Sequence, residues 1–166
     1  MENLIQYFET IPSLHRSIIL VGGITLFWLI EGLVPTRSLS YKKWSHALPN
    51  FFFTATSVLV NFFLAFLLLN TADWTQANGF GILHIVALPL WLYVVLGVLL
   101  LDFIGAYLAH LVEHKVKPLW MVHLVHHSDH HVDTTTANRH HPLESLVRFS
   151  FTLLAVFILG VHPLVW

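Results

Sequence analysis

Apolar residues follow one another along this chain in long runs, without the alternation of apolar and polar positions that marks a half-buried strand. No Asp, Glu, Lys or Arg lies between Lys43 and Asp73, or between Asp73 and Asp102. A helix that crosses a bilayer needs about 20 predominantly apolar residues. Two further apolar runs follow Ser17 and Arg148. We therefore predict four membrane-spanning or membrane-embedded helices, at about 17–33, 47–70, 82–108 and 149–166.

The composition favours a membrane protein built from helices. Hydrophobic residues make up 56% of the chain and charged residues 10%, whereas a soluble domain usually carries about 25% charged residues. Helices satisfy their own backbone hydrogen bonds in lipid, and no run alternates with the period of a membrane barrel strand. We predict an all-α fold, with one membrane domain over residues 1–166 that forms a polytopic helix bundle.

Charge and cysteine content exclude several classes of function. The formal net charge of −1 gives no electrostatic reason to expect a nucleic-acid partner. The chain has no cysteine, which excludes disulfides, thiolate zinc sites and iron–sulfur clusters.

Basic residues mark two of the three predicted connections between spans. They are Arg37, Lys42 and Lys43 in the first connection, and Lys115, Lys117, Arg139 and Arg148 in the third. The second connection has none, so the positive-inside rule places the first and third connections in the cytoplasm. We therefore expect a multi-pass membrane protein with a histidine-rich, metal-binding cap on the cytoplasmic side.

Nine of the 13 histidines lie between His110 and His141. His110 and His114 are four residues apart, and such residues share one face of a helix. The next helical segment repeats this spacing with His123, His126 and His127. Neutral imidazole is a common metal ligand. Five histidines on two antiparallel helix ends exceed what one zinc ion needs, so we predict two metal ions.

A third motif, from Arg139 to Glu144, reads Arg-His-His-Pro-Leu-Glu. The proline restricts the backbone of His141 to extended conformations, which would fix one imidazole. Glu144 could orient a ligating histidine by accepting its second N–H. Asp102 lies eight residues before His110 in an apolar run, where a carboxylate without a partner costs free energy. We therefore expect Asp102 to have a partner and to support the site. Trp120 lies between the first two motifs and is our candidate for substrate contact.

The other histidines are expected to lie outside the ligand set. We expect His130 and His131 to be exposed, and His140 to be a neighbour of the ligands. The remaining four are expected at membrane interfaces or in the core: His15, His46, His84 and His162.

Together these motifs form a recognisable series. In order they are Asp102-Phe-Ile-Gly-Ala-Tyr107, His110-x3-His114, Leu119-Trp120, His123-x2-His126-His127-Ser128-Asp129, Thr134 to Ala137, and Arg139 with His141-Pro142-Leu143-Glu144. The series resembles the fatty acid hydroxylase/sterol desaturase family, and more specifically bacterial proteins of that family. The resemblance covers about Asp102 to Glu144.

This resemblance implies a di-iron oxygenase of the bacterial inner membrane that acts in lipid biosynthesis. Such enzymes use O2 and two electrons to hydroxylate or desaturate a lipid C–H bond, and the lipid could be a sterol, fatty acyl chain, carotenoid or ether lipid. The implied metal is iron, as two ions, and zinc could take its place in purified protein. The implied ligands are His110, His114, His123, His126, His127 and His141, supported by Asp102, Arg139 and Glu144. A separate electron donor is implied, either cytochrome b5-like or a ferredoxin with its reductase, because no nucleotide-binding GxGxxG motif is present.

The family also carries a further HxxHH motif beyond its last membrane helices. No second HxxHH motif follows His141 before Trp166, so we expect this sequence to be a fragment, truncated before the last histidine box. Three alternatives stay open: a catalytically inactive truncated relative, a membrane metal-binding or transport protein, and a b-type haem carrier. The last two are disfavoured because the spans hold few ionisable residues and the paired histidines lie at a membrane end.

Overall fold

The computed structural model describes residues 11–34 and 41–163, apart from the side chains of Ser13, Arg16 and Ser17. Within these ranges every regular element is helical, which confirms the predicted all-α fold. The elements are α2 (Ser13–Leu33), α3 (Lys43–Ala77), the short 3-10 helix η1 (Ile82–His84), α4 (Leu90–Asp102), the π-helix η2 (Phe103–Leu108), α5 (Ala109–Lys115), α6 (Lys117–His127), the 3-10 helix η3 (Thr136–Asn138) and α7 (Pro142–Leu159).

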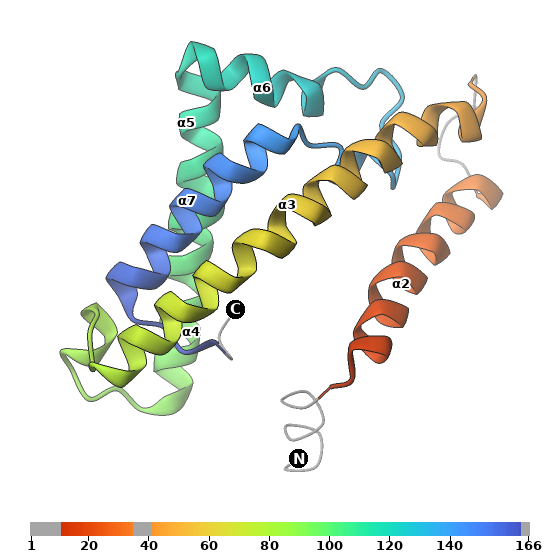
Figure 1. Cartoon of the computed structure of the whole chain (residues 1–166). Helices are drawn as coiled ribbons and strands as arrows, with labels where there is room; N and C mark the ends of the chain where they lie inside the picture. Colours follow the sequence, from red (N-terminus) through yellow and green to blue (C-terminus); the bar gives the residue numbers. More distant parts are fainter. Residues whose placement is uncertain (1–10, 35–40, 164–166) are drawn as a thin grey trace.

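Three long helical segments pack side by side, and the short helix α6 lies across one end of them (Figure 1). The segments are α3, α7 and the continuous stretch formed by α4, η2 and α5. α6 turns sharply away from α5 and crosses the top of the bundle, and the segment after it runs back to the start of α3. α2 stands apart from these three segments and approaches α3 only near the beginning of α3. The bundle therefore presents α5, α6 and the start of α7 together at one end.

Three helices of the described chain are long and apolar enough to cross a membrane: Lys43–His84, Leu90–Lys115 and Pro142–Leu159. Large apolar side chains such as Phe62 and Phe66 are exposed on α3, at 74% and 75%. Water would penalise such a surface, whereas lipid accommodates it. The chain is a membrane protein. The first predicted span is apolar but shorter than the others, at Ile18–Leu33.

The fourth predicted helix begins seven residues earlier than the apolar pattern indicated. α7 starts at Pro142, and the ring of His141 caps it by accepting the N–H of Leu143 at 3.2 Å. Proline suits the first turn of a helix because the missing N–H has no partner there. Because α7 begins at Pro142, Glu144 and Arg148 lie in its first two turns, close to the histidines. The predicted residues 164–166 lie outside the described chain.

The end of the bundle away from the histidines is closed by two glycines with positive φ. Gly81 (φ +123°) precedes η1, and Gly160 (φ +67°) ends α7 in the left-handed conformation. A Cβ atom on Gly81 would collide with the backbone of Gly160. The core of the described chain is a cluster of buried apolar residues: Leu68, Ala72, Leu83, Leu101, Ala155, Val156, Leu159 and Val161.

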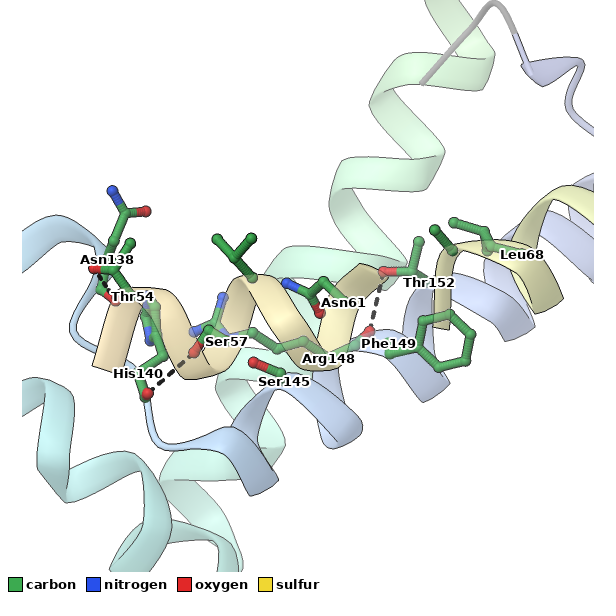
Figure 2. A pocket seen from close by; sticks show the side chains of 12 residues that line it. Thr54, Ser57, Asn61, Leu68, Asn138, His140, Ser145, Arg148, Phe149 and Thr152 are labelled. Carbon is green, nitrogen blue, oxygen red and sulfur yellow. Dashed lines mark hydrogen bonds between the residues drawn. The ribbon is translucent and has the colours of Figure 1, made fainter. Parts of the chain in front are cut away.

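A cavity of about 420 Å³ lies between α3 and α7, below the crossing segment (Figure 2). Polar groups gather at the end nearer α6, where Ser57 donates to the carbonyl of His140 at 3.1 Å. Leu68 and Phe149 line the other end. The cavity, called the α3–α7 groove below, falls within the usual volume of small-ligand sites. A second cavity of about 390 Å³ lies between α2 and α3, and its lining includes Trp28, Trp44 and Phe51.

Candidate metal centre

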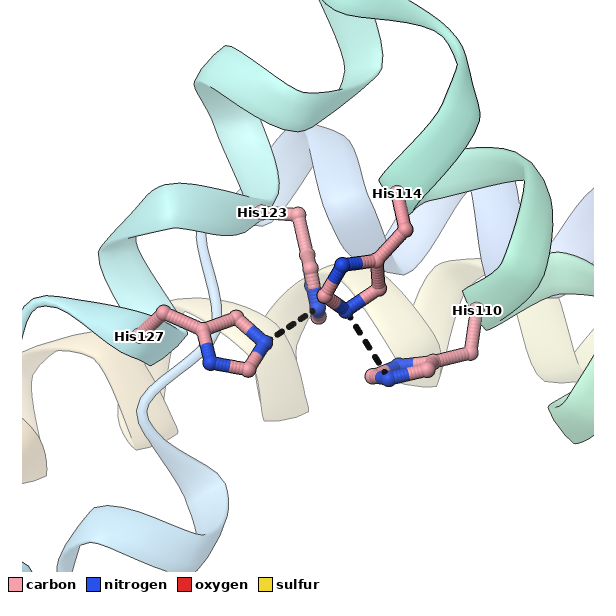
Figure 3. Close-up of side chains that lie close together, drawn as sticks. All are labelled: His110, His114, His123 and His127. Carbon is pink, nitrogen blue, oxygen red and sulfur yellow. Dashed lines mark hydrogen bonds between the residues drawn. The ribbon is translucent and has the colours of Figure 1, made fainter.

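Two helices bring four histidines to one point (Figure 3). His110 and His114 lie one turn apart on α5, and His123 and His127 lie one turn apart on α6. Val116 has an extended backbone between the two helices, and this sharp turn folds the paired faces toward each other. One ring nitrogen from each of the four side chains lies within 4.8 Å of all the others.

The nitrogen spacing suits a single metal ion. Nε2 of His114 lies 3.1 Å from Nε2 of His110, and Nε2 of His127 lies 3.0 Å from Nε2 of His123. Tetrahedral coordination at the usual metal–nitrogen bond length separates two ligand nitrogens by about 3.3 Å. Imidazole donors suit zinc, iron, copper and nickel. The four residues, called the histidine cluster below, therefore fit a transition-metal ion.

Two buried carboxylates lie beside Nδ1 of His123, the ring nitrogen that faces away from the cluster. Glu144 Oε1 lies 2.9 Å from His123 Nδ1, and Glu113 Oε2 lies 3.6 Å from the same nitrogen. When His123 donates its Nδ1–H to Glu144, its Nε2 lone pair points into the cluster, which is the tautomer that a metal requires. Burial lowers the pKa of His123, against the opposing effect of Glu144, so the ring stays neutral and able to ligate.

Arg148 neutralises these carboxylates. Its Nε donates to Glu144 Oε1 at 3.0 Å, and one terminal nitrogen lies 3.3 Å from Glu113 Oε2 and 3.2 Å from His110 Nδ1. Glu113 and Glu144 are each 1% exposed, and buried charges of this kind need partners. Sequence reasoning missed Glu113, although its place inside the His110–His114 motif was a signal. It placed Arg148 among the basic residues of the third connection and did not anticipate its contacts with Glu113, Glu144 and His110.

The remaining predicted ligands lie near the cluster but outside it. The ring of His126 stacks on that of His140, with centroids 4.6 Å apart, and its Nδ1 has no hydrogen-bond partner in the described chain. Burial, followed by the neighbouring His140, lowers the pKa of His126 to about 4. His140 contacts Glu144 at 2.8 Å, and His141 caps α7. Ligation by His126 and His141 stays a prediction.

Trp120 lies close to the histidine cluster, whereas Arg139 contacts the end of α6. The ring of Trp120 is 5.0 Å from that of His114 and 5.5 Å from that of His127. Arg139 braces the end of α6 by donating to the carbonyl of Val125 and to Ser128 Oγ, both at 3.0 Å. Substrate contact by Trp120 stays a prediction.

Asp102 is not brought to the cluster. It is exposed at the end of α4 and makes no hydrogen bond or ion pair within the described chain. Eight helical residues rise by about 12 Å, which a short aspartate side chain cannot bridge. The support expected from Asp102 therefore comes from Glu113, Glu144 and Arg148 in the structure.

A second polar network fixes the segment after α6 to the beginning of α3. His46 lies between two buried carboxylates, 2.8 Å from Asp129 and 3.2 Å from Asp133. Burial raises the pKa of Asp129, but hydrogen bonds from Thr136 and His46 outweigh it and hold that pKa well below its usual range. Burial and Asp133 raise the pKa of Tyr41, which donates to Asp133, to about 12. His46 was expected at an interface or in the core, and its ion pairs were not anticipated. His130 and His131 are exposed, as predicted.

The part of the chain that contains the histidine cluster, residues 94–166, is similar to a known protein family. Residues 94–166 match the family model described as fatty acid hydroxylase. This part of the chain is similar to the fatty acid hydroxylase family. The predicted resemblance to this family is confirmed over residues 94–166, and the matched range contains the whole histidine cluster.

One curated relative is the ornithine lipid hydroxylase OlsE of Rhizobium tropici, which is 31% identical over 72 residues. The aligned stretch is 43% of this chain and 22% of that protein, so the chain spans only a small part of its relative's length. No solved structure matches the chain.

Proposed function

We propose that this chain is part of a membrane-bound oxygenase that hydroxylates or desaturates a C–H bond of a lipid with O2 and two electrons. The observation that carries the proposal is the histidine cluster, which lies within the segment that matches the fatty acid hydroxylase family. Its position at the end of a bundle with a lipid-facing surface suits a substrate drawn from the membrane.

The metal that we propose is iron, as two ions in the full site. When bound, iron would supply the O2 and one-electron chemistry that amino-acid side chains lack. The histidine cluster would hold one ion, and His126 and His141 are our candidates for the second. Glu144 keeps His123 in the ligating tautomer, and Arg148 offsets the charge of Glu113 and Glu144. Zinc could replace iron in purified protein, because affinity alone does not select iron.

The substrate that we propose is a lipid: a sterol, a fatty acyl chain, a carotenoid or an ether lipid. The α3–α7 groove supports this class because its polar end reaches Arg148, which contacts His110, while its other end is apolar. The name of the relative, an ornithine lipid hydroxylase, agrees with a lipid substrate. Trp120 is our candidate for a substrate contact, since its ring lies beside two histidines of the cluster.

We further propose that the cluster faces the cytoplasm of a bacterial inner membrane and receives electrons from a separate donor, cytochrome b5-like or a ferredoxin with its reductase. The basic residues of the predicted first and third connections support this orientation. A cysteine introduced at Asn78 should be labelled from outside the cell, and one at His130 from inside. Labelling with the opposite pattern would overturn the orientation.

The experiment that tests the function combines metal content with lipid oxidation. The protein is purified from membranes as wild type and as His123→Ala, His127→Ala and His130→Ala. We expect both cluster variants to lose bound metal and O2-dependent lipid oxidation, while His130→Ala, at an exposed site outside the cluster, keeps both.

Unchanged metal content in the two cluster variants would contradict the metal centre. Bound metal without any oxidation of added lipid would instead favour an inactive relative or a metal-binding membrane protein.

A further inference from the structure

One contact of the histidine cluster has the wrong polarity for a metal ligand. A terminal nitrogen of Arg148 lies 3.2 Å from Nδ1 of His110. Guanidinium groups only donate hydrogen bonds, so Nδ1 of His110 must accept. A neutral imidazole has one N–H, and here it must be on Nε2. That nitrogen faces Nε2 of His114 at 3.1 Å, inside the cluster.

His123 has the opposite arrangement. Its Nδ1 faces the acceptor Glu144, so its Nε2 carries the free lone pair. A ligating histidine normally donates its second N–H to a carboxylate, carbonyl or water. If His110 ligated through Nε2, its proton would be on Nδ1 and would face an N–H of Arg148. Two donors would then oppose each other, so the contact with Arg148 and ligation by His110 exclude each other.

A carboxylate that could replace Arg148 lies nearby. Glu113 Oε2 is 3.3 Å from the same guanidinium nitrogen, without hydrogen-bond geometry, and both of its oxygens are buried without a hydrogen-bond partner in the described chain. Glu113 is three residues after His110 on α5. Arg148 also has room to move, because its side chain is 30% exposed and lines the α3–α7 groove.

We propose that Arg148 is a positioning residue that keeps His110 out of the ligand set until the guanidinium turns toward the groove. The released ring exchanges its tautomer, donates Nδ1–H to Glu113 and offers Nε2 to the metal, with no change in its net charge. This inference rests on the metal centre of the proposed function, and it assigns Arg148 and Glu113 roles that the family match does not.

A double-mutant cycle on zinc affinity tests the proposal in the full chain. The zinc dissociation constant is measured by chelator competition for His110→Ala in the wild-type background and in the Arg148→Gln background. Unlike a guanidinium group, the glutamine amide can turn its carbonyl oxygen toward Nδ1 of His110 and accept a hydrogen bond from it. We expect His110→Ala to weaken zinc binding by about tenfold more in the Arg148→Gln background, within the range known for groups that orient ligands.

Two controls separate this effect from simple electrostatics. Loss of the Arg148 charge alone would change zinc affinity equally with or without His110, and His114→Ala should cost the same in both backgrounds. Lys117→Gln, which removes an exposed charge that makes no ion pair in the described chain, should leave the cost of His110→Ala unchanged. Equal costs of His110→Ala in the wild-type and Arg148→Gln backgrounds would overturn the proposal.

A measurement on the unmutated protein covers the case in which Arg148→Gln fails to fold. Ring 15N shifts of histidine-labelled protein report which nitrogen carries the proton. We expect His110 to be protonated on Nε2 in the metal-free protein and on Nδ1 after zinc is added. Protonation of Nδ1 in the metal-free protein would contradict the inference. Loss of zinc binding in His123→Ala, measured separately, reports on the metal centre itself.

Discussion

The side chains of His123 and Glu144 are both 0% exposed, and they form a hydrogen bond of 2.9 Å. The two residues come from different helices, α6 and α7, and are 21 positions apart in sequence. A buried, charged hydrogen bond is strong because water cannot compete for either partner. This bond therefore fixes both the orientation and the tautomer of the most buried histidine of the cluster.

Glu144→Gln should weaken metal binding without removing it. The amide keeps the size of the side chain but loses the negative charge that favours donation from His123, and it can also present an N–H to that ring. We expect zinc affinity to fall by about 10- to 100-fold, as for other groups that orient ligating histidines. Chelator competition measures the change.

The matched control is Glu31→Gln, because Glu31 accepts hydrogen bonds from Thr134 and contacts none of the four histidines. Zinc affinity should be unchanged in this variant. An equal loss in both variants would indicate a general effect on folding rather than a role for Glu144 at the cluster.

The histidine motifs were predictable because their geometry is local. Residues four apart on a helix share a face wherever that helix lies, so the pairs His110–His114 and His123–His127 follow from spacing alone. The choice between His126 and His127 does not, since both are within one turn of His123. Packing decides it, because His126 stacks on His140 from the segment before α7.

The supporting groups were harder to predict because they meet through tertiary contacts. Arg148 reaches His110 across 38 positions, and His46 reaches Asp129 across 83. No periodicity in the sequence encodes such pairings. Asp102 shows the opposite error: helical phase suggested a shared face with His110, but phase ignores the rise along the helix axis.

Asp102→Asn should leave metal binding unchanged. The carboxylate is exposed at the end of α4 and contacts no residue of the cluster. A charge in an apolar membrane segment costs a few kcal/mol even on permissive insertion scales, so its removal should raise the yield of inserted protein. Metal content and membrane yield, measured side by side, check both parts. A fall in metal content at unchanged yield would restore the supporting role that the sequence suggested.

Gly81→Ala should destabilise the bundle at the end away from the histidines. Gly81 has φ +123°, which side-chain-bearing residues rarely adopt, and the added Cβ would overlap the backbone of Gly160. We expect a clearly lower apparent melting temperature in detergent. Gly22→Ala is the control, because a Cβ on that α2 residue meets no atom within 4 Å. A similar melting temperature for both variants would contradict the close approach of η1 and α7.

The metal-free protein should become less stable as the pH falls from about 6.5 toward 4. Burial, followed by His140, lowers the pKa of His126 to about 4, so this ring stays neutral in the folded protein over that interval. In the unfolded chain the same ring takes up a proton below its ordinary pKa of about 6.5. The unfolded state therefore binds more protons in this window, and stability is lost as the pH decreases. Burial lowers the pKa of His123 as well, which adds to the same trend.

Thermal unfolding of chelator-treated protein at pH 7 and pH 5 measures this loss. His126→Gln removes one of the rings that titrate, so the melting temperature should fall less between the two pH values than it does in the wild type. His130→Gln removes an exposed ring and should keep the full decrease. Because the metal is absent throughout, competition between protons and metal cannot produce the difference. A decrease of the same size in His126→Gln and wild type would show that His126 is not held neutral by its burial against His140.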